Sequence, residues 1–270
     1  MSKTTRRTGR RDVRPPLPIA ALAAACALFL LLPLVALVLR APWGRLAEEF
    51  ARPEIGAALW LSLRVSLVAT LLSLLLGVPL AWLLARWDFP GRSFVRGVAL
   101  LPLVLPPVVG GVALLLVLGR LGIVGGLLED LFGLRFFGTT AGVVVAETFV
   151  ALPFLVLTVE AALRSLDIRF EDAAATLGAS AWTVFRRITL PAVMPALGAG
   201  AVLAWARALG EFGATITFAG NLPGRTQTIP LAVYVELQRG LDGAIALSLV
   251  LVVISLTVIV AMRDRLVSSL

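Results

Sequence analysis

The residues of this chain that could take part in chemistry are ionisable side chains inside long apolar runs. Arg207 and Glu211 are four residues apart in one run, which puts them on one helix face, where they can neutralise each other. Arg64 and Glu147 lie in other runs, at a depth similar to that of Arg207. A charge at the centre of a bilayer costs roughly 2.5–3.5 kcal/mol. The four residues therefore predict either a structural charge network or an element that attracts an anion along a path.

The sequence offers little for enzymatic chemistry. It has no histidine, and its single cysteine, Cys26, lies in the first apolar run, so neither a multi-cysteine metal site nor a disulfide within one chain is expected. A hydrolase would have to use the carboxylates Glu147, Glu160 and Glu211, which have no nucleophile–base partner in the pattern. The phosphate-binding pattern Gly-x-x-x-x-Gly-Lys is also missing. We expect no catalytic site, no bound cofactor and no metal in this chain, so any ATP hydrolysis must come from another chain.

The composition indicates a polytopic helical membrane protein. Of 270 residues, 59% are hydrophobic and 15% are charged, and the apolar residues form runs of about 20, the length that crosses a bilayer. We predict an all-α fold with six spanning helices in a single membrane domain, residues 17–262, flanked by a basic tail, 1–16, and a short tail, 263–270. The predicted spans are residues 17–39, 55–85, 94–118, 139–163, 190–218 and 243–262.

The distribution of basic residues predicts the orientation. A net charge of +8 could suggest nucleic acid, but six basic residues precede the first apolar run, as in a cytoplasmic flank that faces anionic membrane lipid. With six crossings, 15 lysines and arginines fall on one side and 7 on the other, with Arg64 and Arg207 inside runs. We therefore expect both termini in the cytoplasm and no nucleic-acid partner.

The third run contains LPLVLPPVVGG, residues 101–111. Pro102, Pro106 and Pro107 each lack a backbone donor and crowd a carbonyl one turn back, so the helix must kink or open within the membrane. Freed carbonyls are tolerated there only against protein or a watery cavity. The run is thus either a kinked packing helix or, with Gly110, part of a transport path.

The stretch Glu171–Pro191, EDAAATLGASAWTVFRRITLP, is the most polar break among the apolar runs. Its charges exclude a spanning helix, while its apolar residues recur at three- and four-residue spacing. Gly178 interrupts this stripe, which predicts two short helices that meet at a bend. The charge count places the whole loop, residues 164–189, in the cytoplasm, and the small residues at the bend would let a partner approach closely.

The same stretch resembles the EAA motif of bacterial ABC importer permeases. Asp172-Ala173-Ala174 is followed by Gly178 six residues after Asp172, and by Ile188 ten residues after that glycine. Asp172 stands where the family has glutamate, so either it or Glu171 can fill that position. The resemblance implies coupling helices that dock on a separate ATPase through these residues: Glu171, Asp172, Ala173, Ala174, Gly178, Ala179, Ile188 and Pro191.

Three further stretches, residues 101–111, 207–215 and 220–234, resemble molybdate permeases, with tungstate and sulfate permeases as near relatives. The resemblance covers about residues 55–262. It implies a homodimer in the bacterial inner membrane that works with two ATPase subunits, which bind ATP and Mg, and with a periplasmic oxyanion-binding protein. Sulfate, thiosulfate or another small solute remains an alternative cargo. The candidate path residues are Pro106, Pro107, Gly110, Arg207, Glu211 and Thr215.

Overall fold

The computed structural model describes residues 16–268, with side chains for residues 16–260. Within these residues the secondary structure is helical and contains no strand, which confirms the all-α class. Residues 1–15 of the predicted basic tail lie outside the described part. The chain divides into two units, residues 1–41 and 42–270. The first holds α1, Leu17–Leu39, an apolar helix that begins with proline in its first turn and has no buried residue.

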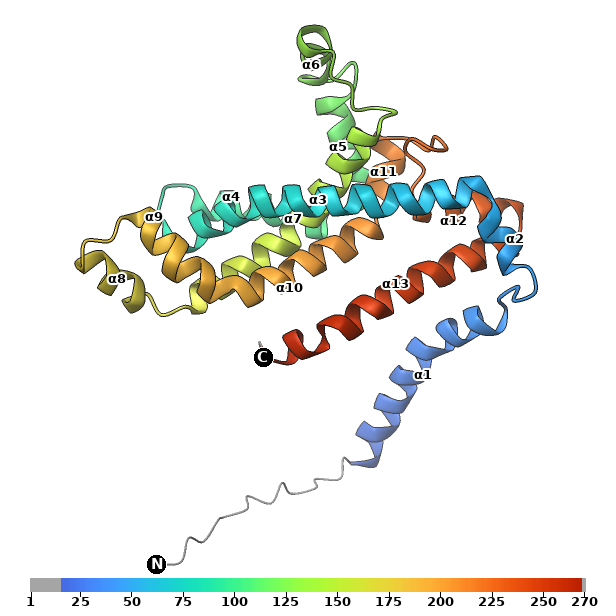
Figure 1. Ribbon diagram of the computed structural model, residues 1–270, viewed down its shortest axis with the longest axis horizontal. Helices are drawn as coiled ribbons and strands as arrows, with labels where there is room; N and C mark the ends of the chain where they lie inside the picture. The colour runs from blue at the N-terminus through green and yellow to red at the C-terminus, as the bar shows by residue number, and fades with distance from the viewer. Residues whose placement is uncertain (1–15, 269–270) are drawn as a thin grey trace, which may run out of the picture. The chain divides into compact units, whose positions relative to one another are not determined.

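The core of the second unit is built by three long helices, α3 (Pro53–Arg86), α7 (Thr140–Ser165) and α10 (Leu190–Leu209), which lie side by side in Figure 1. α7 contacts both of the others and is buried over much of its length. Glycines allow the close approach: a Cβ on Gly77 would lie 3.0 Å from one methyl of Leu155, and a Cβ on Gly200 would lie 3.1 Å from its other methyl. Small residues that let backbones approach are typical of helix packing in membranes.

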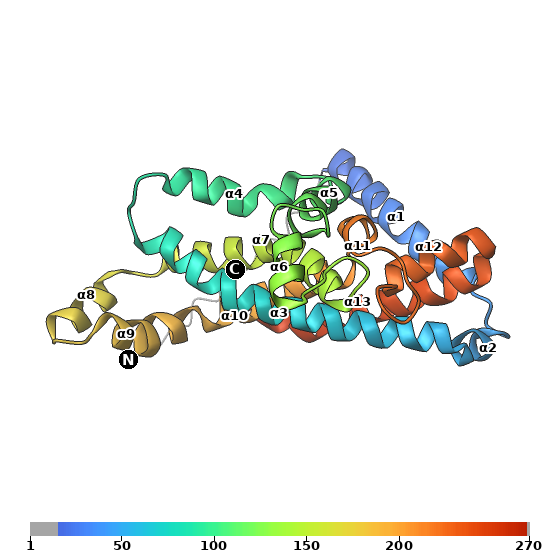
Figure 2. The same ribbon diagram turned by 90° about the horizontal axis from the view of Figure 1, so that it is seen from above.

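The third apolar run is two helices, α4 (Arg92–Val104) and α5 (Pro107–Leu118), and α5 turns away from the direction of α4 in both Figure 1 and Figure 2. Leu105 and Pro106 between them have extended or polyproline-like ψ angles, 131° and 130°. The prolines therefore break the helix into two rather than only kink it. A short helix follows, α6 (Gly125–Phe132).

The fifth run, predicted as one helix over residues 190–218, is also broken. α10 ends at Leu209 and α11 spans Gly213–Phe218. The break is stabilised by Glu211, whose Oε1 accepts a hydrogen bond from the backbone N–H of Ala214 at 2.7 Å. A carboxylate that binds a free N–H at a helix start stabilises the new helix, so the polar residue that sequence analysis assigned to a spanning helix instead begins another one.

The remaining helices are at the two ends of the second unit. α2 (Leu46–Ala51), α12 (Ile229–Arg239) and the start of α13 (Leu241–Ser268) lie near one end of α3, and α8 (Arg169–Thr176) and α9 (Ala181–Val184) lie beyond its other end (Figure 1). A π-helical turn, η1 (Phe185–Thr189), joins α9 to α10. Among the described residues, five helices are long and apolar enough to cross a membrane: Leu17–Leu39, Pro53–Arg86, Thr140–Ser165, Ala181–Leu209 and Leu241–Val260. The apolar helix α5 is shorter.

Candidate functional site

The polar stretch forms two short arms, α8 and the α9–η1 turn, which meet at Gly178 as the sequence predicts. Gly178 has φ of +85°, a left-handed conformation that glycine adopts without strain. The hydroxyl of Ser180 accepts a hydrogen bond from the Thr183 N–H at 3.3 Å and so caps α9. α8 and α9 have no buried residue, whereas Thr189 in η1 is buried.

Glu171 connects the arms to the membrane helices. Its Oε1 accepts hydrogen bonds from Nη2 of Arg86, at 3.1 Å, and from the hydroxyl of Thr189, at 2.8 Å. Nε of Arg86 lies 3.0 Å from Oε2, an ion-pair contact without hydrogen-bond geometry. Asp172 is exposed, and only its backbone carbonyl receives a side-chain hydrogen bond, from Thr176 at 2.8 Å. Of the two acids, Glu171 therefore makes the internal contact, whereas the Asp172 carboxylate has no hydrogen bond or ion pair among the described residues.

The other residues of the motif lie on the surface of the arms. Ala173, Gly178 and Pro191 are exposed, and Ala174, Ala179 and Ile188 are half-buried. Large apolar side chains are exposed beside them: Phe170 at 63%, Leu177 at 89% and Trp182 at 67%. Apolar side chains on a polar segment indicate a contact surface, because water alone would favour burying them.

A cluster of arginines fixes the ends of α3, α4 and α7 near the arms. The carbonyl oxygen of Leu84, in the last turn of α3, accepts hydrogen bonds from Arg92 at 2.9 Å and from Arg164 at 3.0 Å. Glu160 is 4% exposed and accepts from Arg96 and Arg164, each at 2.9 Å. Cations near a helix C-terminus are stabilising. The sequence points to Glu160 but does not reveal this cluster, because its members are up to 80 residues apart.

Only part of the four-residue charge network is present within the chain. Nη1 of Arg207 lies 2.6 Å from Oε2 of Glu211, which is 1% exposed. Glu147, on α7, is equally buried and interacts electrostatically with Glu211. Its Oε2 has no hydrogen-bond partner among the described residues. Arg64 does not join the other three: it is exposed on α3 between the outward-facing Trp60 and Leu67, with no ion pair among the described side chains.

The two helix breaks meet where α5 crosses α11. A Cβ on Gly213 would lie 2.9 Å from Cβ of Pro107, and a Cβ on Gly111 would lie 1.7 Å from the Thr217 hydroxyl oxygen. The sequence singled out Gly110 but not Gly111 as a path residue, although both glycines follow the double proline. Gly110 is buried against Phe149, with 2.9 Å between its notional Cβ and the ring.

The remaining candidate residues of the path lie on both sides of this crossing. Pro106 and Pro107 are exposed, while Thr215 is fully buried and its hydroxyl has no hydrogen-bond partner among the described residues. Arg207 and Glu211 lie just before α11. The crossing thus brings the proline break, the charged pair and an unpaired hydroxyl into one region. No group of three or more histidine, cysteine, aspartate or glutamate side chains suited to a metal occurs within the described residues.

Comparisons with known proteins agree with this architecture. The molybdenum transport system permease protein ModB of Mycobacterium tuberculosis is 46% identical over 243 residues, 90% of this chain and 92% of that protein. The sulfate transport system permease protein CysT of Escherichia coli K12 is 38% identical over 215 residues, 78% of this chain and 77% of that protein.

The fold is shared with a solved structure, the crystal structure of a bacterial ABC transporter involved in the import of the acidic polysaccharide alginate. It has a TM-score of 0.71 at 22% identity and covers 92% of this chain and 94% of that one. Residues 77–269 match the family described as binding-protein-dependent transport system inner membrane component. With this match over most of the chain and relatives well above 30% identity, the protein belongs to the family of binding-protein-dependent transport system inner membrane components.

Proposed function

We propose that this chain is the permease subunit of an ATP-driven importer that carries molybdate, or the similar tungstate, across the inner membrane. The observation that carries the proposal is the 46% identity to a molybdenum permease over 90% of the chain, against 38% over 78% for a sulfate permease. A sulfate or thiosulfate importer is the competing assignment within the same family.

Six crossings are proposed, with the α4–α5 pair as the third. α4 has 13 residues and α5 has 12, so each alone is shorter than the roughly 20 residues that cross the hydrocarbon core, and this crossing would need both helices. The excess of lysine and arginine then puts both termini, the arms α8 and α9, and Arg86 at the cytoplasmic side. α2 and α12 would lie at the periplasmic side, where a periplasmic oxyanion-binding protein would dock.

Arg64 supports a homodimer. It lies 11 residues inside α3, about 17 Å from the outer end of the helix, and it is exposed among apolar side chains without an ion partner among the described residues. A guanidinium that faced lipid at that depth would cost roughly 2.5–3.5 kcal/mol. We therefore assign this face of α3 to a second copy of the chain or to a watery path between the copies.

The arms α8 and α9 are proposed to bind the ATPase. Their exposed apolar residues, Phe170 and Leu177, would enter a groove on that subunit, and Asp172 would meet a basic group there. Movement of the ATPase would reach the membrane helices by two routes, the direct continuation of α9 through η1 into α10 and the contact of Glu171 with Arg86 on α3. ATP and Mg would remain on the ATPase.

The crossing of α5 and α11 is the proposed gate region of the path. Discontinuous helices near the membrane centre are typical of transport sites, because their unpaired backbone groups face a cavity or a substrate. Arg207 would attract the oxyanion, while Glu211 and Glu147 would limit how tightly it binds. The paired Arg207 is only 25% exposed, so an opening of this crossing has to precede contact with an anion.

One experiment tests the proposal. The protein is purified with its co-expressed ATPase, reconstituted with its binding protein, and assayed for ATP hydrolysis with molybdate, tungstate or sulfate. We expect molybdate and tungstate to stimulate hydrolysis and sulfate to have little effect. Stimulation by sulfate alone would contradict the assignment of molybdate as the cargo. Failure to copurify an ATPase would contradict the role as an importer subunit.

A further inference from the structure

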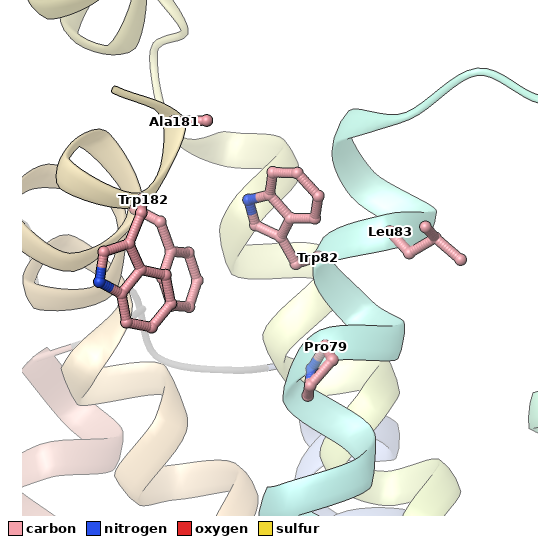
Figure 3. A pocket seen from close by; sticks show the side chains of 6 residues that line it. Pro79, Trp82, Leu83, Ala181 and Trp182 are labelled. Atoms are coloured by element: carbon pink, nitrogen blue, oxygen red, sulfur yellow. The ribbon is translucent and has the colours of Figure 1, made fainter. Parts of the chain in front are cut away.

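An apolar cleft separates the end of α3 from the α9 arm. It has a volume of about 430 Å³ and is lined by Pro79, Trp82 and Leu83 on one side and by Ala181, Trp182 and Phe185 on the other. Figure 3 shows the rings of Trp82 and Trp182 on opposite sides of the opening. The volume is in the range of about 300–1,000 Å³ that is usual for ligand pockets, and its lining suits a hydrocarbon chain.

Aromatic contacts keep the two walls apart and ordered. The ring of Phe185 stacks on Trp182, with 5.7 Å between the centroids, and meets Trp82 edge-on at 6.4 Å. Trp182 nevertheless remains 67% exposed. The cleft is therefore formed in the single chain and open to a molecule from outside it.

The position of the cleft along α3 matches the boundary of a membrane. Trp82 is four residues, about one turn, before Arg86, the last residue of α3. Trp87 follows the helix and is 58% exposed. Tryptophan beside arginine is typical of the level of lipid headgroups, where the ring is half in hydrocarbon and the cation reaches water.

Two unpaired positive charges lie next to the apolar lining. Arg186 and Arg187 directly follow Phe185, are both exposed, and have no hydrogen bond or ion pair with any described side chain. Arg186 is four residues after Trp182 and so shares its side of the helical turn. Nearby arginines behave differently: Arg86, Arg96 and Arg164 each pair with a glutamate.

We propose that this cleft binds an anionic phospholipid of the inner leaflet, with one acyl chain between Trp82 and Trp182 and the phosphate at Arg186 and Arg187. An apolar slot whose lining residue Phe185 is followed directly by two exposed arginines matches an amphiphile that has one hydrocarbon chain at the slot and a net negative headgroup. A zwitterionic lipid would fill the slot but leave a positive charge beside the arginines. A helix from a second copy would cover the slot without neutralising them.

The bound lipid would hold the α9 arm against α3. Its effect on transport rests on the function proposed above, in which α9 belongs to the ATPase-binding segment. The binding itself does not, because the cleft and both arginines belong to this chain alone. A test on the permease without its ATPase therefore separates failure of the lipid site from failure of the transport assignment.

The test uses the tryptophans as reporters. The full chain is reconstituted in phosphatidylcholine bilayers that contain a low fraction of brominated phosphatidylglycerol, and quenching of tryptophan fluorescence is compared with that by brominated phosphatidylcholine at the same fraction. We expect stronger quenching by phosphatidylglycerol. The variant R186Q/R187Q should lose the preference, with an affinity loss of about fivefold for each arginine and about thirtyfold for both. Arg225→Gln, which removes one exposed charge at the other end of the unit, should retain it.

A second variant tests the slot rather than the charges. Ala181→Phe would fill the cleft and should reduce quenching by both brominated lipids while the two arginines remain. Equal quenching by the two lipids in the unmodified chain, or an unchanged preference in R186Q/R187Q, would overturn the proposal. So would efficient disulfide cross-linking of Trp182→Cys between two copies in bilayers that contain phosphatidylglycerol, because a second copy would then occupy the cleft.

Discussion

Arg86 at the end of α3 and Glu171 in α8 are 85 residues apart and form the ion pair that ties α8 to the long helices. Their side chains are only 11% and 14% exposed. α8 has no buried residue of its own, so this pair, with the hydrogen bond from Thr189 to Glu171, supplies the side-chain attachment that the structure gives to that helix.

The first prediction concerns this attachment. Glu171→Gln should raise hydrogen exchange of the α8 amides by about tenfold to about a hundredfold, because a hydrogen bond to a charged group contributes about 1.5–3 kcal/mol. Asp172→Asn is the matched control, since the Asp172 carboxylate is exposed. Hydrogen-exchange mass spectrometry of the purified permease measures both. Equal exchange of α8 in the two variants would show that Glu171 does not hold the arm.

A second prediction concerns Arg207 and Glu211. Arg207→Gln removes the partner of a carboxylate that is 1% exposed, and breaking a buried pair costs about 3–5 kcal/mol. We expect lower abundance in the membrane, and recovery in the double variant R207Q/E211Q. If Arg207 also attracts the oxyanion, uptake per folded molecule should stay low in the double variant. Uptake that returns with abundance would limit the pair to a structural role.

The crossing of α5 and α11 gives a third prediction. In Gly111→Ala the new methyl would lie 1.7 Å from the Thr217 hydroxyl oxygen and 2.8 Å from the backbone oxygen of Ala214. The Thr217 side chain can rotate away, but the backbone cannot move without strain. We therefore expect the free energy of unfolding to fall by about 1–3 kcal/mol. Gly97→Ala in α4, with nothing within 4 Å of its Cβ, should unfold at the same temperature or slightly higher. Unfolding in detergent compares the two variants, and equal losses would refute the tight crossing.

The pH dependence of stability at the end of the second unit that holds α2 and α12 follows from Glu236 in α12. A hydrogen bond from Arg52, at 2.8 Å, and the nearby charges of Arg52 and Arg239 hold the pKa of Glu236 below its ordinary value of 4.5, against the effect of burial. The folded state then binds fewer protons than the unfolded state, so this group stabilises the fold above pH 4.5 and the stabilisation is lost as the pH falls through the lower folded pKa.

The measurement is the unfolding temperature from neutral pH to below 4.5. The unfolding temperature of the unmodified chain should fall over the acid part of the range. Glu236→Gln should unfold at a lower temperature at neutral pH, and its unfolding temperature should fall less steeply with acid. Glu54→Gln serves as a control, because no ion pair of Glu54 occurs among the described residues. If the unfolding temperature of Glu236→Gln fell with acid as steeply as that of the unmodified chain, Glu236 would not be the source of this pH dependence.

Local features of the fold could be predicted from the sequence because their causes are local. The bend at Gly178, the break at Pro106 and Pro107, and the pairing of Arg207 with Glu211 each depend on residues within a few positions of one another. The break after Leu209 could not, since it needs Glu211 to cap a new helix and Pro107 to lie against Gly213, contacts that an apolar run does not reveal.

The same reason explains what the sequence left open at the arms. Glu171 and Asp172 are equivalent in the motif, and the contacts of Glu171 with Arg86, 85 residues away, and with Thr189 distinguish them. Arg64 matches the depth of Arg207 in the sequence, but the rotation of α3 about its axis, set by the packing of Val65 and Ala69 on other helices, turns Arg64 outward. Depth follows from counting residues, whereas direction depends on tertiary packing.

Uptake of isotope-labelled molybdate tests the central claim most directly. Proteoliposomes would contain the permease with its ATPase, with ATP at the cytoplasmic face and the binding protein at the other. We predict accumulation that requires both ATP and the binding protein and is reduced by excess tungstate but not by excess sulfate. Accumulation of sulfate instead, or no ATP-dependent accumulation of molybdate by a complex that hydrolyses ATP, would contradict the account.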